Sequence, residues 1–259
     1  MKNKMRLDAY LVQKGIVENR SRAQQLIRGK HVQIDDELCT KAGKLVAPIS
    51  KISVDNILRY VSRGGNKLEY AIEKFCMDVN GKVAADLGAS TGGFTDCLIQ
   101  KGAQKVYSVD IGSGQLHKKL RENQKICYVE GKDARYLSKL PEDTKVDLVV
   151  IDISMHPLES VLLAIQNILK KDGEIVALIK PQFEIQKQVV SDKNERKKAL
   201  YKVVQDIGKF NLYVAGLIRS PLKGGLKNQG NIEYLIYLVQ KPQRFEVYKT
   251  IEKLIDEEQ

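Results

Sequence analysis

Short runs of apolar residues alternate with segments of helical apolar spacing from Lys82 to the end of the chain. The short runs predict strands, and apolar residues repeated every three or four positions predict helices. Strands that alternate with helices in this way form a mostly parallel sheet flanked by helices, an α/β fold. We expect strands at 83–86, 106–109, 126–129, 146–151, 175–179, 212–218 and 232–239, and helices at 94–99, 158–169, 195–207 and 245–255.

The first sixty residues carry a different pattern, with shorter elements. The apolar positions from Leu7 to Val12 predict a short helix, and a second helix is expected between an N-cap at Ser21 and Gly29. Short strands are expected at 31–34, 45–46 and 52–54. The pattern therefore predicts a small α+β domain over residues 1–58, an interdomain linker at 59–65 and the α/β domain over residues 66–259.

The chain is basic, with 43 Lys and Arg against 32 Asp and Glu and a formal net charge of +11. This balance favours a polyanionic partner, with nucleic acid ahead of an acidic membrane surface. We expect RNA phosphate contacts from basic residues at the start of the chain, around the second helix and in the linker: Arg6, Arg20, Arg22, Arg28, Lys30, Arg59 and Arg63.

Cysteine and histidine positions argue against a metal centre. The four cysteines form no Cys-x-x-Cys pair and there are three histidines, so neither a metal cluster nor a disulfide framework is expected. The sequence carries no secretory signal pattern, and no apolar run approaches the ~18 residues of a membrane span. We therefore expect a cytoplasmic protein without stable membrane association. The oligomeric state is left open.

A glycine-rich turn follows the first strand of the α/β domain. The order Gly-x-x-x-Gly-Gly after Asp86 differs from the Gly-x-Gly-x-x-Gly of a dinucleotide site and fits S-adenosylmethionine, which has no pyrophosphate. Asp110, at the tip of the second strand, can accept both hydroxyls of an adenosine ribose. Asp133 is expected either near the adenine or as a helix cap. The predicted cofactor-binding residues are Asp86, Gly88, Ser90, Thr91, Gly92, Gly93, Phe94, Asp110 and Asp133.

Charged residues also stand at the ends of other strands. Asp152 and Lys180 end adjacent strands, Glu233 stands at the start of the last strand, and Lys67 precedes a helix. Each alone is usually a solvated charge, but together at one crevice they would form a lysine–aspartate–lysine–glutamate set. Such a set suits methylation of a ribose hydroxyl. A lysine whose pKa is lowered by crowding and desolvation can take the hydroxyl proton or stabilise the alkoxide.

Motifs in this sequence resemble those of two known families. Residues 5–55 resemble the S-four type RNA-binding domain, through Met5-Arg6-Leu7-Asp8, Arg20-Ser21-Arg22-Ala23 and the glycines that end both helices. The rest of the chain resembles the TlyA (haemolysin A) group of FtsJ-like methyltransferases in five motifs: Val61-Ser62-Arg63-Gly64-Gly65, Asp86-Leu87-Gly88-Ala89-Ser90-Thr91-Gly92-Gly93-Phe94, Val109-Asp110-Ile111-Gly112, Lys180-Pro181-Gln182-Phe183-Glu184 and Gly230-Asn231-Ile232-Glu233-Tyr234.

The resemblance implies a Rossmann-like class I methyltransferase with a mostly parallel seven-stranded sheet. It implies methyl transfer from S-adenosylmethionine to cytidine ribose 2′-hydroxyls in 23S and, in some members, 16S ribosomal RNA, so ribosomal RNA or ribosomal subunits are the implied partners. The family's catalytic set falls on Lys67, Asp152, Lys180 and Glu233, with Lys180 as the central base. Residues 59–62 fall where the family couples RNA binding to cofactor binding.

The sequence departs from the family pattern in three segments. Asp35 and Asp36 replace the usual Asn-Gly turn, residues 153–157 replace a serine–phenylalanine pair, and residues 185–194 contain none of the glycines of a glycine-rich loop. Other functions therefore stay open. They are a haemolysin-like, pore-forming protein and an RNA-binding protein that retains the methyltransferase fold without activity, with a dinucleotide oxidoreductase as a more remote alternative.

Overall fold

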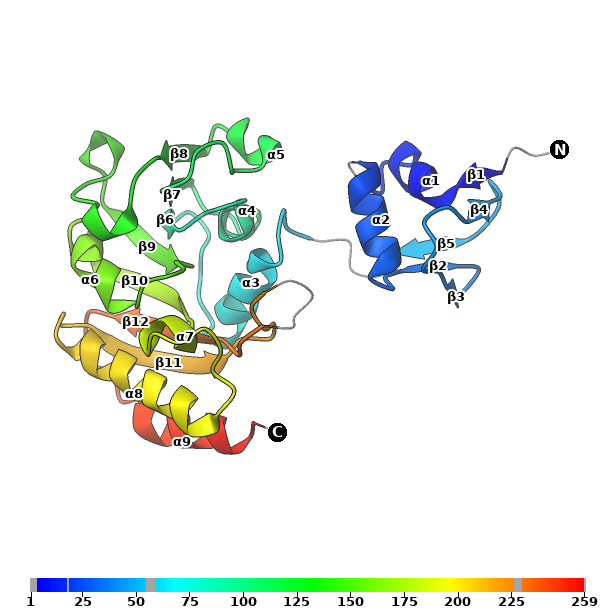
Figure 1. Ribbon diagram of the computed structural model, residues 1–259. Coiled ribbons are helices and arrows are strands. Elements are labelled where there is room, and N and C mark those ends of the chain that lie inside the picture. Colours follow the sequence, from blue (N-terminus) through cyan, green and yellow to red (C-terminus); the bar gives the residue numbers. More distant parts are fainter. Residues whose placement is uncertain (1–3, 18, 55–58, 226–229, 259) are drawn as a thin grey trace. The chain divides into compact units, whose positions relative to one another are not determined.

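A computed structural model describes residues 4–17, 19–54, 59–225 and 230–258 of the 259-residue chain. The chain divides into two compact units, Met1–Arg59 and Tyr60–Gln259 (Figure 1), and each has a hydrophobic core of its own. The domain boundary predicted at residue 58 lies outside the described residues.

The smaller unit is an α+β domain whose two helices pack on short antiparallel strands. Strand β1 pairs with β4, and β2 pairs with both β3 and β5. Its core is built from the apolar positions of the predicted helices, among them Leu7, Leu11, Leu26 and Ile27. The elements are β1 (Met5–Arg6), α1 (Leu7–Gln13), α2 (Arg20–Arg28), β2 (Val32–Ile34), β3 (Glu37–Leu38), β4 (Leu45–Val46) and β5 (Ile52–Val54).

Helix α2 begins two residues earlier than the sequence predicts. Asn19, in the extended conformation that an N-cap adopts, accepts a hydrogen bond from the Arg22 amide at 2.9 Å. Asparagine caps a helix about as well as serine, so the prediction of Ser21 as the cap is wrong. The turn after β2 has left-handed backbone at both Asp35 (φ 54°) and Asp36 (φ 67°), as a two-residue hairpin turn requires.

The larger unit is an α/β domain built on a seven-stranded sheet. The strand order is β11-β12-β10-β9-β6-β7-β8; β12 runs antiparallel to β11 and to β10, and the pairs from β10 to β8 are parallel. The prediction of a mostly parallel seven-stranded sheet is confirmed. The elements are α3 (Gly64–Lys74), β6 (Val83–Leu87), α4 (Gly93–Gln100), β7 (Lys105–Asp110), α5 (Lys118–Arg121), β8 (Ile126–Glu130), the 3₁₀ turns η1 (Ala134–Tyr136) and η2 (Pro141–Asp143), β9 (Val146–Ile151), α6 (Glu159–Gln166), β10 (Leu169–Ile179), α7 (Pro181–Glu184), α8 (Lys193–Gly208), β11 (Tyr213–Arg219), β12 (Tyr234–Val239) and α9 (Val247–Asp256).

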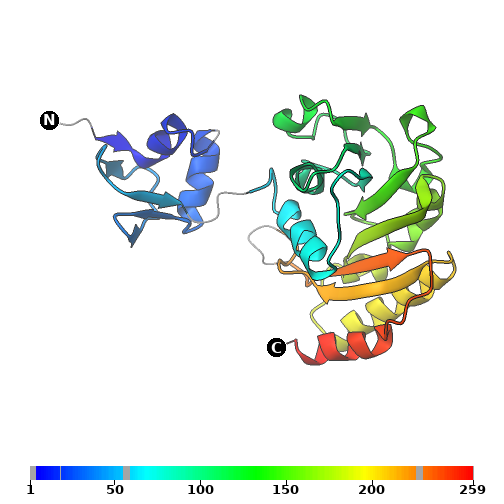
Figure 2. The same ribbon diagram turned by 180° about the vertical axis from the view of Figure 1, so that it is seen from behind.

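Helices cover both faces of this sheet (Figures 1 and 2). Residues 148–151 of β9 are apolar without interruption because both faces of the strand are buried: Leu148 and Val150 belong to the core under α3 and α4, whereas Val149 and Ile151 belong to the core under α6, α8 and α9. A strand buried on both faces reads as a continuous apolar run instead of an alternating one.

The sequence prediction is wrong between the end of α6 and the start of β10. Helix α6 ends at Gln166, three residues before the predicted end at 169, and β10 begins at Leu169, six residues before the predicted start at 175, so it contains residues 171–173, which were expected between the two elements. The pairing of β10 with β9 changes register between Leu169 and Glu174. An irregular strand therefore absorbs the charged residues and the glycine that resemble a turn in the sequence.

The parallel strands bring the predicted site residues to one edge. Strands β6, β7, β9 and β10 run in the same direction, so Leu87, Asp110, Ile151 and Ile179 end them at a common edge. The carboxyl edge of such a sheet is where α/β folds bind ligands.

Candidate active site

The loop between β6 and α4 turns so tightly that side chains at its glycines would collide with neighbouring chain. Gly88 has a φ of 85°, and a Cβ there would lie 2.7 Å from the Asp152 carbonyl oxygen. Gly92, the N-cap of α4, has a φ of 93°, and its Cβ would lie 2.4 Å from Leu120. Both glycines are needed because the loop passes between the end of β9 and the segment that carries α5.

A cavity of about 270 Å³ opens beside this loop. Three predicted catalytic residues, Lys67, Asp152 and Lys180, line it together with six predicted cofactor residues: Asp86, Gly88, Ser90, Thr91, Gly93 and Phe94. The structure therefore brings most of the predicted site to one place, although Gly92, Asp110, Asp133 and Glu233 do not line the cavity themselves.

Asp86 contributes a buried oxygen that has no protein partner. Its Oδ2 accepts hydrogen bonds from the Thr95 amide (2.9 Å) and the Thr95 hydroxyl (2.6 Å). Its Oδ1 is buried without a hydrogen bond among the described residues, and the side chain lines the cavity. Burial raises the pKa of Asp86 to about 7. A buried acceptor without a partner is unfavourable, so this oxygen fits a ligand that brings a positive charge or a donor.

Asp110, the last residue of β7, connects the glycine loop after β6 to the loop that follows β7. Its carboxylate accepts hydrogen bonds from the amides of Ser90 and Gly112, each at 2.7 Å, and the residue is almost fully buried. Each oxygen keeps a free lone pair, so the carboxylate can still accept ligand hydroxyls. Its position beside Ser90 of the glycine loop fits the predicted ribose contact.

Asp133 makes the contacts of a cap. It accepts a hydrogen bond from the Arg135 amide at the start of η1 and forms a salt bridge of 2.6 Å with the Arg135 guanidinium, which lowers the pKa of Asp133. The guanidinium also lies 3.2 Å from His156 Nδ1. Of the two alternatives drawn from the sequence, these contacts favour capping over the adenine.

The four predicted catalytic residues form two buried or half-buried ion pairs. Lys67 of α3 pairs with Glu233, and both side chains are buried. Lys180 Nζ lies 2.7 Å from Asp152 Oδ1. Burial raises the pKa of Glu233, the charge of Lys67 lowers it, and weaker effects of Asp152 and Lys180 also reach this carboxylate. The two pairs are therefore close enough to sense each other's charge.

Ser154 is a site residue that the sequence reasoning missed. Its hydroxyl lies 2.7 Å from Lys180 Nζ, and it lines the cavity. The feature of the sequence that points to Ser154 is its place two residues after Asp152, inside the segment 153–157 that departs from the family pattern. Lys180 therefore has a carboxylate and a hydroxyl to orient its ammonium group.

The segment predicted as a linker is packed within the larger unit over most of its length. Tyr60 is buried, the Val61 amide donates to Asp96 of α4 at 2.8 Å, and Gly64 and Gly65 form the first turn of α3. A Cβ at Gly65 would lie 2.2 Å from the Tyr60 ring. The glycines therefore serve close packing, and residues 60–65 belong to the larger unit instead of forming a separate linker.

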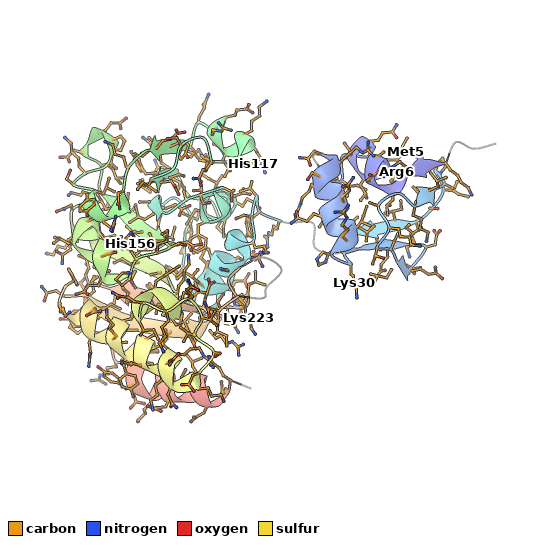
Figure 3. The ribbon with its side chains drawn as sticks, in the orientation of Figure 1. Met5, Arg6, Lys30, His117, His156 and Lys223 are labelled. Atoms are coloured by element: carbon orange, nitrogen blue, oxygen red, sulfur yellow. The ribbon has the colours of Figure 1, made fainter. Side chains whose placement is uncertain are left out.

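Most of the predicted RNA-binding residues have exposed or half-exposed side chains, whereas Arg63 lines the cavity. Arg6 and Arg20 both contact the buried carboxylate of Asp8, at 3.0 and 3.1 Å, and keep about half of their side chains exposed. Figure 3 shows Arg6 by the start of α1 and Lys30 beyond the end of α2. Arg22 is half-buried, and Arg28, Lys30 and Arg59 are exposed, whereas Arg63 lines the cavity and donates to the Gly225 carbonyl.

Comparison with known proteins identifies families for both units. The sequence profile of the FtsJ-like methyltransferases matches residues 60–238, and the profile of the S4 domain matches residues 5–48. The chain is 36% identical over 246 residues to the 16S/23S rRNA (cytidine-2′-O)-methyltransferase TlyA of Mycobacterium tuberculosis, covering 92% of this chain and 91% of the relative.

Two further relatives carry a different name. Hemolysin A of Brachyspira hyodysenteriae is 36% identical over 242 residues, which are 91% of this chain and the whole of the relative. A solved structure of a candidate hemolysin from Streptococcus thermophilus superposes with a TM-score of 0.75 at 33% identity, covering 99% of this chain and 96% of that one. In the described part of the chain, no helix is long and apolar enough to cross a membrane.

Proposed function

Because the chain belongs to the FtsJ-like methyltransferases, which depend on S-adenosylmethionine, and carries an S4 domain, we propose that it methylates the 2′-hydroxyl of a cytidine ribose in ribosomal RNA. The observation that carries the proposal is the meeting of two chemistries at one cavity. The glycine-rich turn and Asp86, with its unpartnered oxygen, line the same cavity as Lys180 and its two partners, Asp152 and Ser154.

The cofactor residues follow from the contacts already described. Asp86 Oδ1 would accept the ammonium group of the cofactor's methionine part, and the carboxylate of Asp110 would accept the ribose hydroxyls. When bound, the cofactor supplies an electrophilic methyl group. Gly88 and Gly93 leave room along the cavity wall for the ligand to approach the backbone.

Lys180 is the residue proposed to activate the ribose hydroxyl. A ribose hydroxyl is a poor nucleophile at neutral pH, so a nearby amine that takes its proton accelerates attack. Asp152 and Ser154 hold Nζ in place. In its neutral amine form, Lys180 accepts the hydroxyl proton, and Asp152 stabilises the ammonium group that results. Lys67, which is held by Glu233, adds a second fixed charge to the cavity wall.

Methyl incorporation tests this proposal. Purified protein, labelled S-adenosylmethionine and either 50S subunits, 30S subunits or free ribosomal RNA are incubated, and the modified nucleotide is located by 2′-O-methyl mapping. We propose cytidine of 23S RNA as the first target, and the result with 30S subunits decides whether 16S RNA is a second one. Wild-type protein that binds the cofactor and leaves every RNA form unmethylated would instead be an RNA-binding protein without activity.

The Lys180→Ala variant separates catalysis from binding. It should lose at least about 100-fold in kcat, since removing a positioned acid–base group costs about 10²–10⁴, whereas the cofactor Kd should stay within about twofold because the Asp86 and Asp110 contacts remain. Lys249→Ala, which removes an exposed lysine of α9, is the matched control. Equal turnover in Lys180→Ala and wild type would rule out Lys180 as the base.

The name of the Brachyspira relative raises membrane lysis as a second candidate. Dye release from liposomes measures it directly. Lysis at low protein concentration that is equal in wild type and Lys180→Ala would establish an activity separate from methyl transfer.

A further inference from the structure

A buried ion pair lies outside the cavity and outside the roles assigned above. Arg196, in the first turn of α8, and Glu258, just after α9, are 5% and 1% exposed, and Arg196 Nε lies 2.7 Å from Glu258 Oε2. Removing two charges from water is costly, and a buried pair is often no more stable than apolar side chains of the same size. The contacts that this pair makes therefore need an explanation besides stability.

Two paths of hydrogen bonds lead from the Arg196–Glu258 pair to the residues on either side of Glu233, and each path is one branch. In the first branch, the hydroxyl of the fully buried Tyr234 donates to Glu258 Oε1. Tyr234 is the first residue of β12 and directly follows Glu233. Successive strand residues point to opposite faces of the sheet: Tyr234 belongs to the core under α8 and α9, while Glu233 reaches Lys67 of α3 on the other face.

The second branch passes through the segment that leads from α7 to α8. The Arg196 guanidinium donates to the carbonyls of Val190 (3.3 Å) and Ser191 (2.6 Å). The side chain of Asn231 then accepts from the Val190 amide at 2.9 Å and donates to the Gln188 carbonyl at 3.1 Å. Asn231 stands two residues before Glu233, so the ion pair reaches the chain on both sides of this carboxylate.

We infer that Arg196 and Glu258 are positioning residues for the proposed methyl transfer: together they fix residues 188–191 and 231–234, and so hold Glu233 against Lys67. This inference rests on the proposed function. Residues 231–233 precede β12 and are tied to the chain after β11 by two backbone hydrogen bonds of 2.9 Å, from the Ser220 amide to the Glu233 carbonyl and from the Gly224 amide to the Asn231 carbonyl. The ion pair adds side-chain contacts to these two bonds, and residues 188–191 lack the glycines of the family pattern. The buried charges supply directed hydrogen bonds to backbone carbonyls, which apolar side chains cannot supply.

The test replaces the ion pair by apolar residues of similar size. The double variant Arg196→Met with Glu258→Leu should fold, because such exchanges are often neutral or stabilising, yet it loses the hydrogen bonds to Val190, Ser191 and Tyr234. We expect kcat for methyl transfer to fall about 10- to 100-fold, as when a distant change misplaces a reacting group, with the cofactor Kd unchanged. The single variant Glu258→Gln, in which Arg196 is kept, retains the size of the side chain and one of its two acceptor oxygens, so its kcat should stay closer to that of the wild type than the kcat of the double variant.

The chain offers a matched control on the same two helices. Lys197 of α8 and Glu252 of α9 form a pair of 2.6 Å that is partly exposed and touches neither segment. The variant Lys197→Met with Glu252→Leu should keep wild-type kcat. All variants are assayed well below their measured midpoints of thermal unfolding, so that kcat reports folded protein.

The outcomes separate this inference from the proposed function. Wild-type kcat in the Arg196→Met, Glu258→Leu variant overturns the inference and leaves the proposed function standing, as does a loss of kcat of the same size in the Lys197→Met, Glu252→Leu control. Absence of methyl transfer by the wild-type protein overturns both. The positioning role is supported when kcat falls in the Arg196→Met, Glu258→Leu variant, stays at the wild-type value in the Lys197→Met, Glu252→Leu control, and is higher in Glu258→Gln than in the first variant.

Discussion

The substitution Asp86→Asn should stabilise the cofactor-free protein as the pH rises from 4 to 8, and it should weaken binding of the cofactor. Asp86 is fully buried, and burial is the main cause that raises its pKa from 3.8 to about 7; the charges of Asp152 and Asp110 act in the same direction, against the hydrogen bonds from Thr95. An asparagine has the shape of the protonated acid and keeps an acceptor for Thr95. The variant therefore removes the cost of the buried charge without opening a cavity.

The sign and size of the effect follow from linkage. A carboxyl whose pKa is raised by folding binds more protons in the folded state, so its stabilising contribution is complete below about pH 4 and is lost as the pH rises through about 7. At 1.36 kcal/mol per pH unit, the loss from pH 4 to pH 8 is ~4 kcal/mol for the wild type and absent in Asp86→Asn. For a unit of this size, it corresponds to a difference of ~8–15 °C in Tm.

Thermal unfolding between pH 4 and pH 8 measures this difference. The two proteins should have similar Tm near pH 4 and diverge as the pH rises, with the variant higher. Asp172→Asn, at an exposed aspartate on β10, controls for a general change of charge. The same Tm profile in wild type and Asp86→Asn would refute the reasoning, because the pH dependence would then come from other groups.

The affinity of the wild-type protein for the cofactor should rise with pH, whereas its stability falls with pH. The carboxylate of Asp86 is the form that pairs with the ammonium group, so wild-type affinity should rise from pH 6 to pH 7.5, through the pKa of about 7. The variant loses a charge-assisted hydrogen bond of about 1.5–3 kcal/mol, which corresponds to about a 10- to 150-fold weaker Kd near pH 7.5. Calorimetric titration at both pH values checks this, and a pH-independent wild-type Kd would contradict the assigned contact.

Three further predictions concern other parts of the molecule. Asp110→Ala should weaken cofactor binding at least about tenfold in a titration, since two loops lose their shared acceptor; an unchanged Kd would exclude the ribose contact. Gly93→Ala should lower the Tm by destabilising the larger unit by about 1–3 kcal/mol, because its Cβ would lie 3.0 Å from the Gly65 amide and 2.1 Å from the Ser62 hydroxyl; a Tm equal to wild type would show that Ser62 and its neighbours yield freely. Asp8→Asn should destabilise the smaller unit by about 2 kcal/mol at pH 7, because Arg6, Gln24 and Arg20 hold the pKa of Asp8 below its usual range; the difference in denaturant unfolding should be constant above about pH 4 and shrink progressively as the pH falls below it, and a difference that does not shrink would point to packing instead.

Much of the fold could be predicted because the signals are local. The apolar run of β9, the glycine order after Asp86 and the helical spacing of α8 each lie within one short stretch, and each predicts its element without knowledge of the rest of the chain. The errors lie where two local signals compete. Ser21 and Asn19 are both good caps, and Lys171, Asp172 and Gly173 resemble a turn although the sheet draws them into β10.

The available chemistry is legible in the order of the amino acids: a glycine turn for a nucleotide-like ligand, two lysines, two carboxylates and a basic module at the start. Which of these side chains contact each other depends on the folded arrangement. Ser154 reaches Lys180, Glu233 pairs with Lys67, and Glu258 closes on Arg196 from 62 residues away. Pairing of this kind depends on strand order and on which face each side chain occupies, and both are fixed by packing between segments that are distant along the chain.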